Sequence, residues 1–355
     1  MRHKVKFFTF TILTLVATLI LSHFMFIPLD STTSAYGSFY SEIENSLDLV
    51  MVGSSTVRDG FIPMEAYHEY GITSHSIVSA PTHLEVIEIA IDEIARTQNP
   101  KVVYIDLNGL NNQSKDNAES FVKDYYSCMP EGESKKALTK KYPYLKEKAD
   151  WELFPNHNNF RQQVFWESLI YNSMLYTKGY NPNKTVQAQE VENVDKAKTL
   201  DMSNDAKTYL NEIIEKCNQY KDRITFIFGM MPRYLSSTIS SFDLYQIHSP
   251  LDAMYIVRSA KSILKEAGYD YIDYWDENYE FDKIGLNPET DQKDAEHLNH
   301  RGAKKFTEYF SKYLMSKYFD NKKPTHSEEV KEEFDEAYEE YLEIIQPIEK
   351  ALKMN

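Results

Sequence analysis

The chain has 355 residues, of which 42% are hydrophobic and 14% aromatic, so it can bury a full core and has room for roughly one to three domains. Its formal net charge of −15 argues against a nucleic-acid partner, because phosphate binding requires a basic surface. The two cysteines, Cys128 and Cys217, have no metal-ligand spacing and give no disulfide framework, although they could pair in an oxidising compartment or stay buried thiols. We therefore expect neither a metal site nor a cofactor.

The N-terminus carries a candidate membrane span. Arg2, Lys4 and Lys6 precede residues 7–29, which contain no Asp, Glu, Lys or Arg. At about 1.5 Å per residue this segment is long enough, as a helix, to cross a bilayer, and the basic flank predicts a cytoplasmic N-terminus. A cleaved signal peptide is the alternative, because Thr33-Ser-Ala35 would be a tolerable cleavage site. The anchor is favoured, since the apolar region of a signal peptide is usually only ~7–15 residues long.

Five short apolar runs bounded by turn residues predict strands. They lie at residues 47–52, 76–78, 101–107, 224–228 and 271–274. Apolar residues at helical spacing separate them, as after the capping box that begins at Thr82, and Asn299 is positioned to cap a last helix. Strands that alternate with amphipathic helices predict a three-layer α/β fold, with a mostly parallel five-stranded sheet covered on both faces.

We divide the chain into an N-terminal membrane anchor at 1–30, an α/β domain at 31–320 and an acidic C-terminal helix at 321–355. Residues 113–200 interrupt the α/β rhythm with a polar segment rich in large aromatic residues. We interpret it as a helical insertion that roofs the site, and ordinary packing is the alternative for any single aromatic residue. The C-terminal part carries an apolar stripe at spacings of three and four, typical of a helix that docks on its own protein and less often of a partner contact.

Two sequence patterns suggest a serine nucleophile with its base. Asp294 stands three residues before His297, so its carboxylate can hold one imidazole nitrogen and leave the other to accept a proton. Gly53-Ser54-Ser55 follows the first predicted strand, which presents a serine in a turn at the carboxyl end of the sheet. Because the residues before the last helix should emerge at the same edge, we expect Ser55, His297 and Asp294 to meet.

Each pattern alone has a commoner explanation. A Gly-Ser-Ser after a strand is usually a turn, and a lone Asp-x-x-His is more often a surface turn or a helix cap. Asp291 and His300 are local competitors for the last two roles, and Ser54 is the alternative nucleophile if the turn is displaced by one residue. The combination of both patterns, at these ends of an α/β chain, is much rarer by chance.

The order of these motifs resembles the SGNH (GDSL-type) hydrolase superfamily, whose first block is Gly-Asp-Ser and whose last is Asp-x-x-His. The resemblance covers roughly residues 47–112 and 224–318. It implies a flavodoxin-like fold in which Ser55 is the nucleophile, His297 is the base, and Asp294 orients the imidazole.

The same resemblance implies an oxyanion hole. The third block, Gly-x-Asn-Asp, is matched by Gly109-Leu-Asn111-Asn112, so Asn111 would contribute its side-chain amide. The spacing after the strand is one residue longer than usual, which makes Asn108 the fallback. The backbone amide of Ser55 is the second donor. The second block normally provides a glycine amide, but this chain has Ser79-Ala80-Pro81, where the Ala80 amide could replace it.

The Gly-Ser-Ser block and the N-terminal span are most similar to the membrane-anchored branch of this superfamily, which includes proteins of teichoic-acid D-alanylation and polysaccharide O-acetylation. This likeness implies a single-pass protein of the cell membrane with an extracytoplasmic domain. It also implies a multi-spanning membrane-bound O-acyltransferase as partner and a cell-envelope glycopolymer as acceptor. Arg58, which matches this pattern, and Asn299 are the candidate substrate-binding residues.

The predicted function is an O-acyltransferase or esterase that forms an acyl-serine and passes the acyl group to a glycopolymer hydroxyl or to water. A non-catalytic binding or scaffold subunit of an acylation complex is the alternative. A secreted lipase or esterase is a third possibility, which the anchor disfavours. The acyl group stays open, and so does the acceptor, which can be neutral or anionic.

Overall fold

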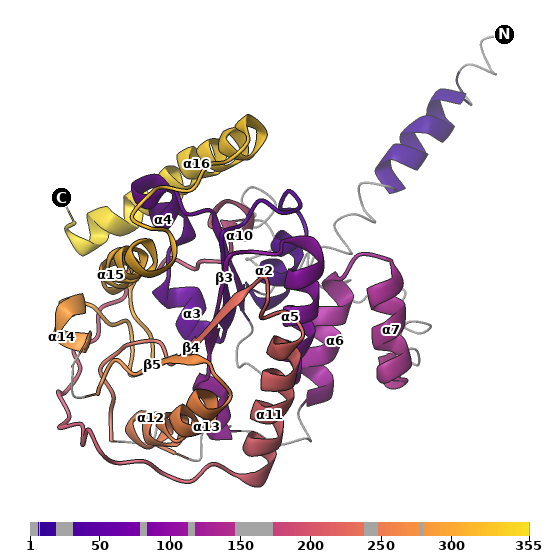
Figure 1. Ribbon diagram of the computed structural model, residues 1–355. Coiled ribbons are helices and arrows are strands. Elements are labelled where there is room, and N and C mark those ends of the chain that lie inside the picture. The colour runs from indigo at the N-terminus through magenta and orange to yellow at the C-terminus, as the bar shows by residue number, and fades with distance from the viewer. Residues whose placement is uncertain are drawn as a thin grey trace.

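The computed structural model describes residues 6, 8–18, 31–78, 84–112, 118–145, 173–237, 248–276 and 280–354. A five-stranded parallel sheet forms the centre of the molecule (Figure 1). Its strands are β1 (Leu49–Gly53), β2 (Ser74–Val78), β3 (Val102–Asp106), β4 (Thr225–Gly229) and β5 (Asp270–Ile272), in the order β2-β1-β3-β4-β5. The predicted α/β class and the five predicted strands are confirmed.

Helices lie on both sides of the sheet. On one side α3 (Ser55–Gly60), α4 (Pro63–Tyr70) and α15 (His300–Tyr318) pack together, and on the other α5 (Leu84–Thr97) packs against α11 (Asn204–Asn218) (Figure 1). The shorter α12 (Pro250–Arg258), α13 (Ala260–Glu266) and α14 (Glu280–Ile284) follow β4 along the chain. Because helices cover both faces, every residue of β1 and β3 is buried, which is why these strands are continuous apolar runs in the sequence.

The strand order reverses at β1, which has β2 on one side and β3 on the other. In open α/β sheets such a reversal creates a crevice at the carboxyl ends of the strands, where ligands bind. The strands on the crevice side end at Gly53 in β1 and Asp106 in β3, and Asp106 pairs with Gly229 at the end of β4. The fold therefore places the turn that follows β1 where α/β proteins usually bind their ligands.

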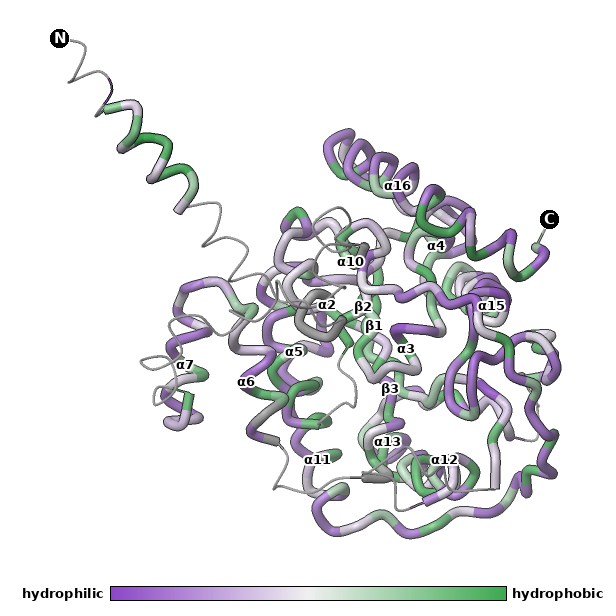
Figure 2. Tube along the Cα trace, turned by 180° about the vertical axis from the view of Figure 1, so that it is seen from behind, coloured by the Kyte–Doolittle hydropathy of each residue, from purple (hydrophilic) through white to green (hydrophobic). Residues whose placement is uncertain are grey.

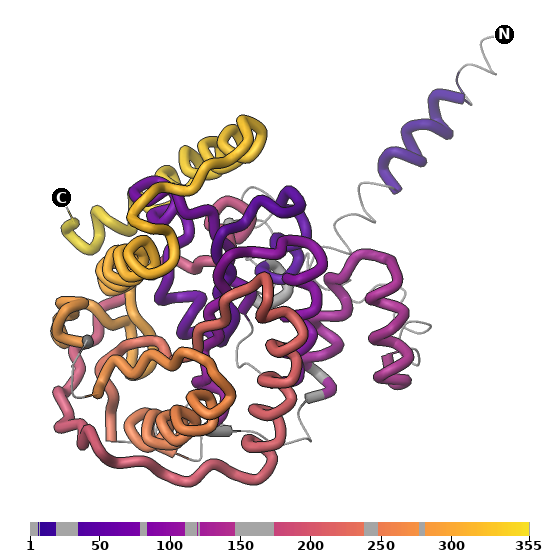
Figure 3. Tube along the Cα trace, viewed as in Figure 1, coloured from indigo at the N-terminus to yellow at the C-terminus, as the bar shows by residue number. Residues whose placement is uncertain are grey.

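The C-terminal helix, α16 (Glu328–Leu352), docks on the body of the protein, against α4, α10 (Ser173–Tyr176) and α15. Its buried side chains include Phe334, whose ring centroid lies 5.0 Å from that of Tyr67 in α4. The hydroxyl of Tyr341 donates to the carboxylate of Glu65 (3.2 Å). Figure 3 shows the yellow α16 beside the much earlier α4. The expected docking of the apolar stripe on its own protein is confirmed.

The predicted insertion has several parts with different surroundings. Its first described helix, α6 (Ala118–Cys128), packs against α2 (Ser31–Phe39) and α5, where the buried ring of Tyr125 lies 4.6 Å from that of Tyr36. Helix α7 (Glu133–Lys141) follows it. Ordinary packing on α2 and α5 thus accounts for α6 in place of the expected roof, and residues 146–172 lie outside the described part of the chain.

The last part of the insertion, residues 177–200, is an irregular segment held close to the sheet. The carbonyl of Lys178 accepts a hydrogen bond from the amide of Ser76 in β2 (2.9 Å), which covers part of the exposed sheet edge. Gly179 has a φ of +86°, and a Cβ at this position would lie 2.2 Å from the carbonyl oxygen of Ser76, so the close approach requires glycine. Farther along, the Asn181 amide donates to the carbonyl of Arg58 (2.9 Å) and brings this segment beside α3.

The N-terminal segment extends away from the body. Residues 8–18 are helical and expose apolar side chains such as Phe8 and Leu13, which are 68% and 62% exposed (Figure 2). Within the described residues, no helix has both the length and the apolar character needed to cross a membrane. Residues 7 and 19–30 lie outside the described part, so the structure does not support the expected span at 7–29, which stays a prediction.

Candidate active site

The candidate nucleophile sits on a tight turn between β1 and α3. Ser54 is the N-cap of α3, and its hydroxyl accepts a hydrogen bond from the amide of Thr56 (3.3 Å), so Ser55 becomes the first helical residue. Gly53 ends β1 where a side chain has no room: a Cβ there would lie 2.6 Å from Val57 Cγ2 and 2.7 Å from Asp106 Cβ. The glycine of the Gly-Ser-Ser motif thus lets β1 turn sharply against β3.

A buried carboxylate at the end of β3 anchors this turn. Asp106 Oδ2 accepts from the hydroxyl of Thr56 (2.8 Å) and from that of Ser54 (3.4 Å), and its Oδ1 accepts from the amide of Met231 (3.1 Å). Burial raises the pKa of Asp106, and these hydrogen bonds oppose the rise. Because Ser54 is buried and its hydroxyl serves the cap and the anchor, its role is structural, and Ser55 is the serine presented at the site.

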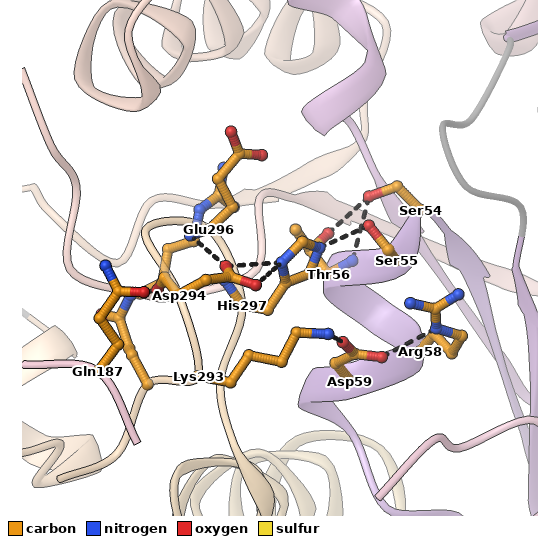
Figure 4. Close-up of polar contacts among 12 residues, drawn as sticks. Ser54, Ser55, Thr56, Arg58, Asp59, Gln187, Lys293, Asp294, Glu296 and His297 are labelled. Atoms are coloured by element: carbon orange, nitrogen blue, oxygen red, sulfur yellow. Dashed lines mark hydrogen bonds and ion pairs between the residues drawn. The ribbon is translucent and has the colours of Figure 1, made fainter. Parts of the chain in front are cut away.

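The structure brings Ser55, His297 and Asp294 together as a hydrogen-bonded chain (Figure 4). Ser55 Oγ lies 2.6 Å from His297 Nε2, and His297 Nδ1 lies 2.8 Å from Asp294 Oδ1 and 3.0 Å from Oδ2. A carboxylate at Nδ1 favours the tautomer that carries its proton there, which leaves Nε2 as an acceptor for the serine proton. The predicted spacing therefore produces the geometry of an activated serine.

Asp294 is held as an acceptor by its own loop. Its Oδ1 accepts from the backbone amides of Glu296 (2.8 Å) and His297 (2.9 Å). Burial alone would raise its pKa, but the hydrogen bond and charge of His297 with these backbone donors lower the pKa of Asp294 to about 2. The carboxylate is thus ionised at neutral pH and can stabilise the imidazolium that forms when His297 takes a proton.

The loop that carries the histidine is braced from both sides. Gln292 bridges Leu298 in antiparallel fashion, and the Lys293 amide donates to the His297 carbonyl (3.0 Å), so residues 292–298 fold back on themselves. The amide of Gln187, from the last part of the insertion, donates to the Gln292 carbonyl (2.9 Å). Figure 4 includes Gln187 among the residues drawn around the triad. This part of the insertion does border the site, as expected of the whole.

Asn299, which we expected to bind substrate, is engaged in hydrogen bonds within the protein. It is fully buried, caps α15 by accepting from the Gly302 amide (3.2 Å), and donates to the carbonyls of Thr290 (2.7 Å) and Thr185 (3.1 Å). All its polar groups thus serve the structure of the loop, and we withdraw the substrate-binding assignment. The competing histidine, His300, is also buried, with Nδ1 2.9 Å from the hydroxyl of Tyr180.

Two cationic side chains beside the triad share a buried carboxylate. Arg58 Nε lies 2.8 Å from Asp59 Oδ1, and Lys293 Nζ contacts Asp59 Oδ2 (Figure 4). Burial alone would raise the pKa of Asp59, but Arg58, His297 and Lys293 together lower it below its usual value. The expectation that Arg58 binds substrate stays a prediction, and sequence reasoning missed Asp59 and Lys293. The sequence signal for these two residues was that Asp59 stands next to Arg58 and Lys293 next to Asp294, both predicted site residues.

The three expected oxyanion donors are described to different extents. The Ser55 amide is at the first position of α3, where helix geometry provides no intrahelical acceptor. Asn111 lies in the short helix η1 (Asn108–Asn112), its side chain outside the described part of the structure, as is all of Ala80. The fallback, Asn108, is buried, and its Oδ1 accepts from the guanidinium of Arg233 (3.0 Å). That bond fixes the amide plane and leaves Nδ2 as its donor.

Within the part of the chain that the structure describes, no group of three or more His, Cys, Asp or Glu residues is arranged to hold a metal ion. No protein-family model matches this chain, and no curated protein matches it significantly. Fold and site together define an α/β protein with a serine–histidine–aspartate chain at the carboxyl edge of its sheet. Its chemistry must be argued from that geometry.

Proposed function

We propose that the protein is an SGNH-type serine acyltransferase or esterase that works through an acyl-serine intermediate. The observation that carries this proposal is the chain of short contacts from Ser55 Oγ through the imidazole of His297 to Asp294. A serine hydroxyl is a poor nucleophile at neutral pH and needs a base that a carboxylate orients. The position of the three residues, at the strand-order reversal where α/β proteins bind ligands, agrees with that role.

In the proposed reaction, Ser55 Oγ attacks the carbonyl carbon of an acyl donor while His297 Nε2 takes the hydroxyl proton. The carbonyl oxygen becomes an oxyanion, which the Ser55 amide and an asparagine amide stabilise by hydrogen bonds. When the intermediate collapses, His297 returns the proton to the leaving group and an acyl-serine remains. An acceptor hydroxyl, or water, then attacks that ester while His297 takes its proton, and His297 returns this proton to Ser55 Oγ as the acyl–serine bond breaks.

The asparagine donor in this proposal is Asn108 or Asn111. Asn108 has the stronger structural support, because it lies two residues after the end of β3 and Arg233 fixes its orientation. The resemblance implied Asn111, and substitution distinguishes the two. Removal of an oxyanion donor costs roughly 10²–10³ in rate, so only one of Asn108→Ala and Asn111→Ala should show that loss.

The proposal places this chemistry at the outer face of the cell membrane. The charge-free stretch at 7–29 would anchor the chain, and the exposed apolar helix at 8–18 is consistent with that use. A multi-spanning membrane-bound O-acyltransferase would supply the acyl group, and a cell-envelope glycopolymer would receive it. Arg58 and Lys293, beside the nucleophile, are the side chains we propose to contact the substrate.

A fluorophosphonate probe tests the proposal, because it labels an activated serine covalently. We expect labelling of the wild-type protein at Ser55, no labelling of Ser55→Ala, and loss of most labelling in His297→Ala. Ser127→Ala is the matched control, since it removes an exposed serine hydroxyl of α6 and should leave labelling at Ser55. An unlabelled wild-type protein, together with polymer acylation in cells that survives Ser55→Ala, would instead favour the scaffold function.

A further inference from the structure

A pocket of about 550 Å³ lies at the end of β5, outside the candidate active site. Residues of the segment 196–207 and of helix α13 line it, together with Asp273, the first residue after β5. Five basic side chains line it: Lys196, Lys207, Arg258, Lys261 and Lys265. Only two carboxylates, those of Asp201 and Asp273, lie among the lining residues.

A buried ion pair forms part of the pocket lining. Arg258 is buried, with its Nε 2.8 Å from Asp273 Oδ2 and its guanidinium bonded to the carbonyls of Trp275 (3.2 Å), Asp195 (2.7 Å) and Lys198 (3.2 Å). These bonds tie the start of the segment at 195–198 to the end of β5. The charge of Arg258 neutralises that of Asp273. Asp201 is the other carboxylate of the lining, which also holds the exposed lysines.

This positive pocket contrasts with the rest of the molecule. The whole chain has a formal net charge of −15, whereas the pocket lining carries more than twice as many basic groups as carboxylates. Lys261 does reach Asp276 (3.6 Å), but that carboxylate is not part of the lining. The hydroxyls of Ser259 and Ser262 add neutral donors. A cavity in which one sign of charge predominates concentrates ligands of the opposite sign.

The pocket and the candidate active site share one edge of the sheet. β4 pairs with β5, and Asp273 extends beyond β5 at the carboxyl edge, where Ser55 follows β1. Aromatic contacts continue from one to the other: Trp275 stacks on Phe281 (6.0 Å between centroids), and Phe281 contacts Tyr234 (5.0 Å). The Tyr234 amide in turn donates to Gln292, in the loop that carries His297.

We propose that this pocket binds the anionic groups of a polymeric acceptor, phosphodiesters or carboxylates, and so holds the chain whose hydroxyl is acylated at Ser55. The identification of the ligand as the acceptor rests on the proposed function, whereas the pocket's affinity for a polyanion does not. A polymer can satisfy both sites at once, because its repeat units carry an acid group beside each hydroxyl-bearing unit. The acceptor is therefore anionic, and a neutral polysaccharide is disfavoured.

Binding measured on the full chain with Ser55→Ala tests this, because no turnover is needed. We expect fluorescein-labelled poly(glycerol phosphate) to bind, and Lys207→Gln/Lys265→Gln to weaken binding at least about fivefold at low salt, with a shallower salt dependence. Lys136→Gln/Lys140→Gln, which removes two exposed lysines of α7, is the matched control and should bind as the parent does.

Two further polymers, polygalacturonate and dextran, show which charged group the pocket recognises. Tighter binding of poly(glycerol phosphate) than of polygalacturonate supports phosphodiester recognition, and the reverse supports carboxylates. Equal binding of neutral dextran, or equal affinities of the pocket and control variants, overturns the proposal. Failure here with Ser55 still labelled by the fluorophosphonate leaves the proposed acyl chemistry intact. Loss of labelling with polymer binding retained would reject the chemistry and keep the pocket.

Discussion

At the scale of single residues, the most informative side chain is that of Arg233, which is not a member of the triad. Arg233 is buried, and its guanidinium donates to Asn108 Oδ1. This hydrogen bond fixes the orientation of the Asn108 side-chain amide, including its donor Nδ2. Burial lowers the pKa of Arg233, while the charges of Glu296, Asp106 and Asp294 oppose that shift. Burying a cation costs desolvation free energy, so the presence of Arg233 at this position calls for a functional explanation. We infer that Arg233 positions Asn108.

Arg233→Met should therefore slow ester turnover by about 10–10²-fold through kcat, with a much smaller change in KM, because the amide acts on the transition state. Asn108→Ala alone should cost roughly 10²–10³, and the double variant should be no slower than Asn108→Ala. Steady-state kinetics with a simple acetyl ester measure these values, and circular dichroism checks the fold. Additive losses would show that Arg233 acts independently of Asn108.

At the scale of elements, the junction of β1, β3 and α3 decides where the nucleophile lies. Gly53 has no space for a methyl group, because Val57 and Asp106 already fill the position. Gly53→Ala must displace α3 or β3, and we expect it to lower the free energy of unfolding by about 1–3 kcal/mol and to reduce fluorophosphonate labelling of Ser55. Gly37→Ala in α2 is the matched control, since nothing lies within 4 Å of a Cβ there.

That control should be neutral or stabilising by roughly 0.5–1 kcal/mol, as expected for glycine to alanine inside a helix. Urea unfolding of both variants gives the comparison. If Gly53→Ala unfolded like the parent and kept its labelling, the close packing of β1 on β3 would have no role in presenting Ser55.

The elements also show what the sequence could and could not predict. Strands β1, β3 and β4 were predicted because both faces of the sheet are covered there, so that each leaves a local apolar run, whereas β2 and β5 gave shorter runs beside polar residues. The serine and the Asp-x-x-His were found because short motifs preserve their spacing. Asp106 and Arg233 were missed, since single polar residues after strands have no periodic signal and their partners are distant in sequence. Asn299 was correctly predicted to cap the last helix, but its sequence neighbours did not reveal that the loop buries it and occupies its polar groups.

At the scale of the whole molecule, a buried ionic cluster joins the start of the α/β domain to its C-terminal helix. Lys178 Nζ lies 2.9 Å from Glu42 Oε2 and 2.6 Å from Glu333 Oε1 of α16, and His75 Nε2 lies 3.8 Å from Glu42 Oε1. Glu42, His75 and Lys178 are all almost fully buried. The segment after α2, the edge strand β2 and α16 thus contribute titratable groups to the same cluster. Docking of α16 therefore depends on the protonation states of those groups.

This cluster predicts a pH dependence of stability. Burial raises the pKa of Glu42 to about 8, although the nearby Lys178 opposes the shift, while burial and Lys178 lower the pKa of His75. Folded protein then holds a proton on Glu42 that the unfolded chain releases, from pH about 4.5 to about 8. The contribution of Glu42 to stability is therefore fully present below about pH 4.5 and is lost as pH rises to about 8.

Glu42→Gln removes that titration and keeps the shape of the side chain. We expect the variant to gain more than about 1 kcal/mol of unfolding free energy relative to wild type between pH 5 and pH 8. Urea unfolding across this range measures it. Glu44→Gln removes a charge at the exposed surface two residues away and is the matched control. A constant difference between wild type and Glu42→Gln over this range would mean that Glu42 is already ionised in the fold, and that Lys178 holds two carboxylates at once.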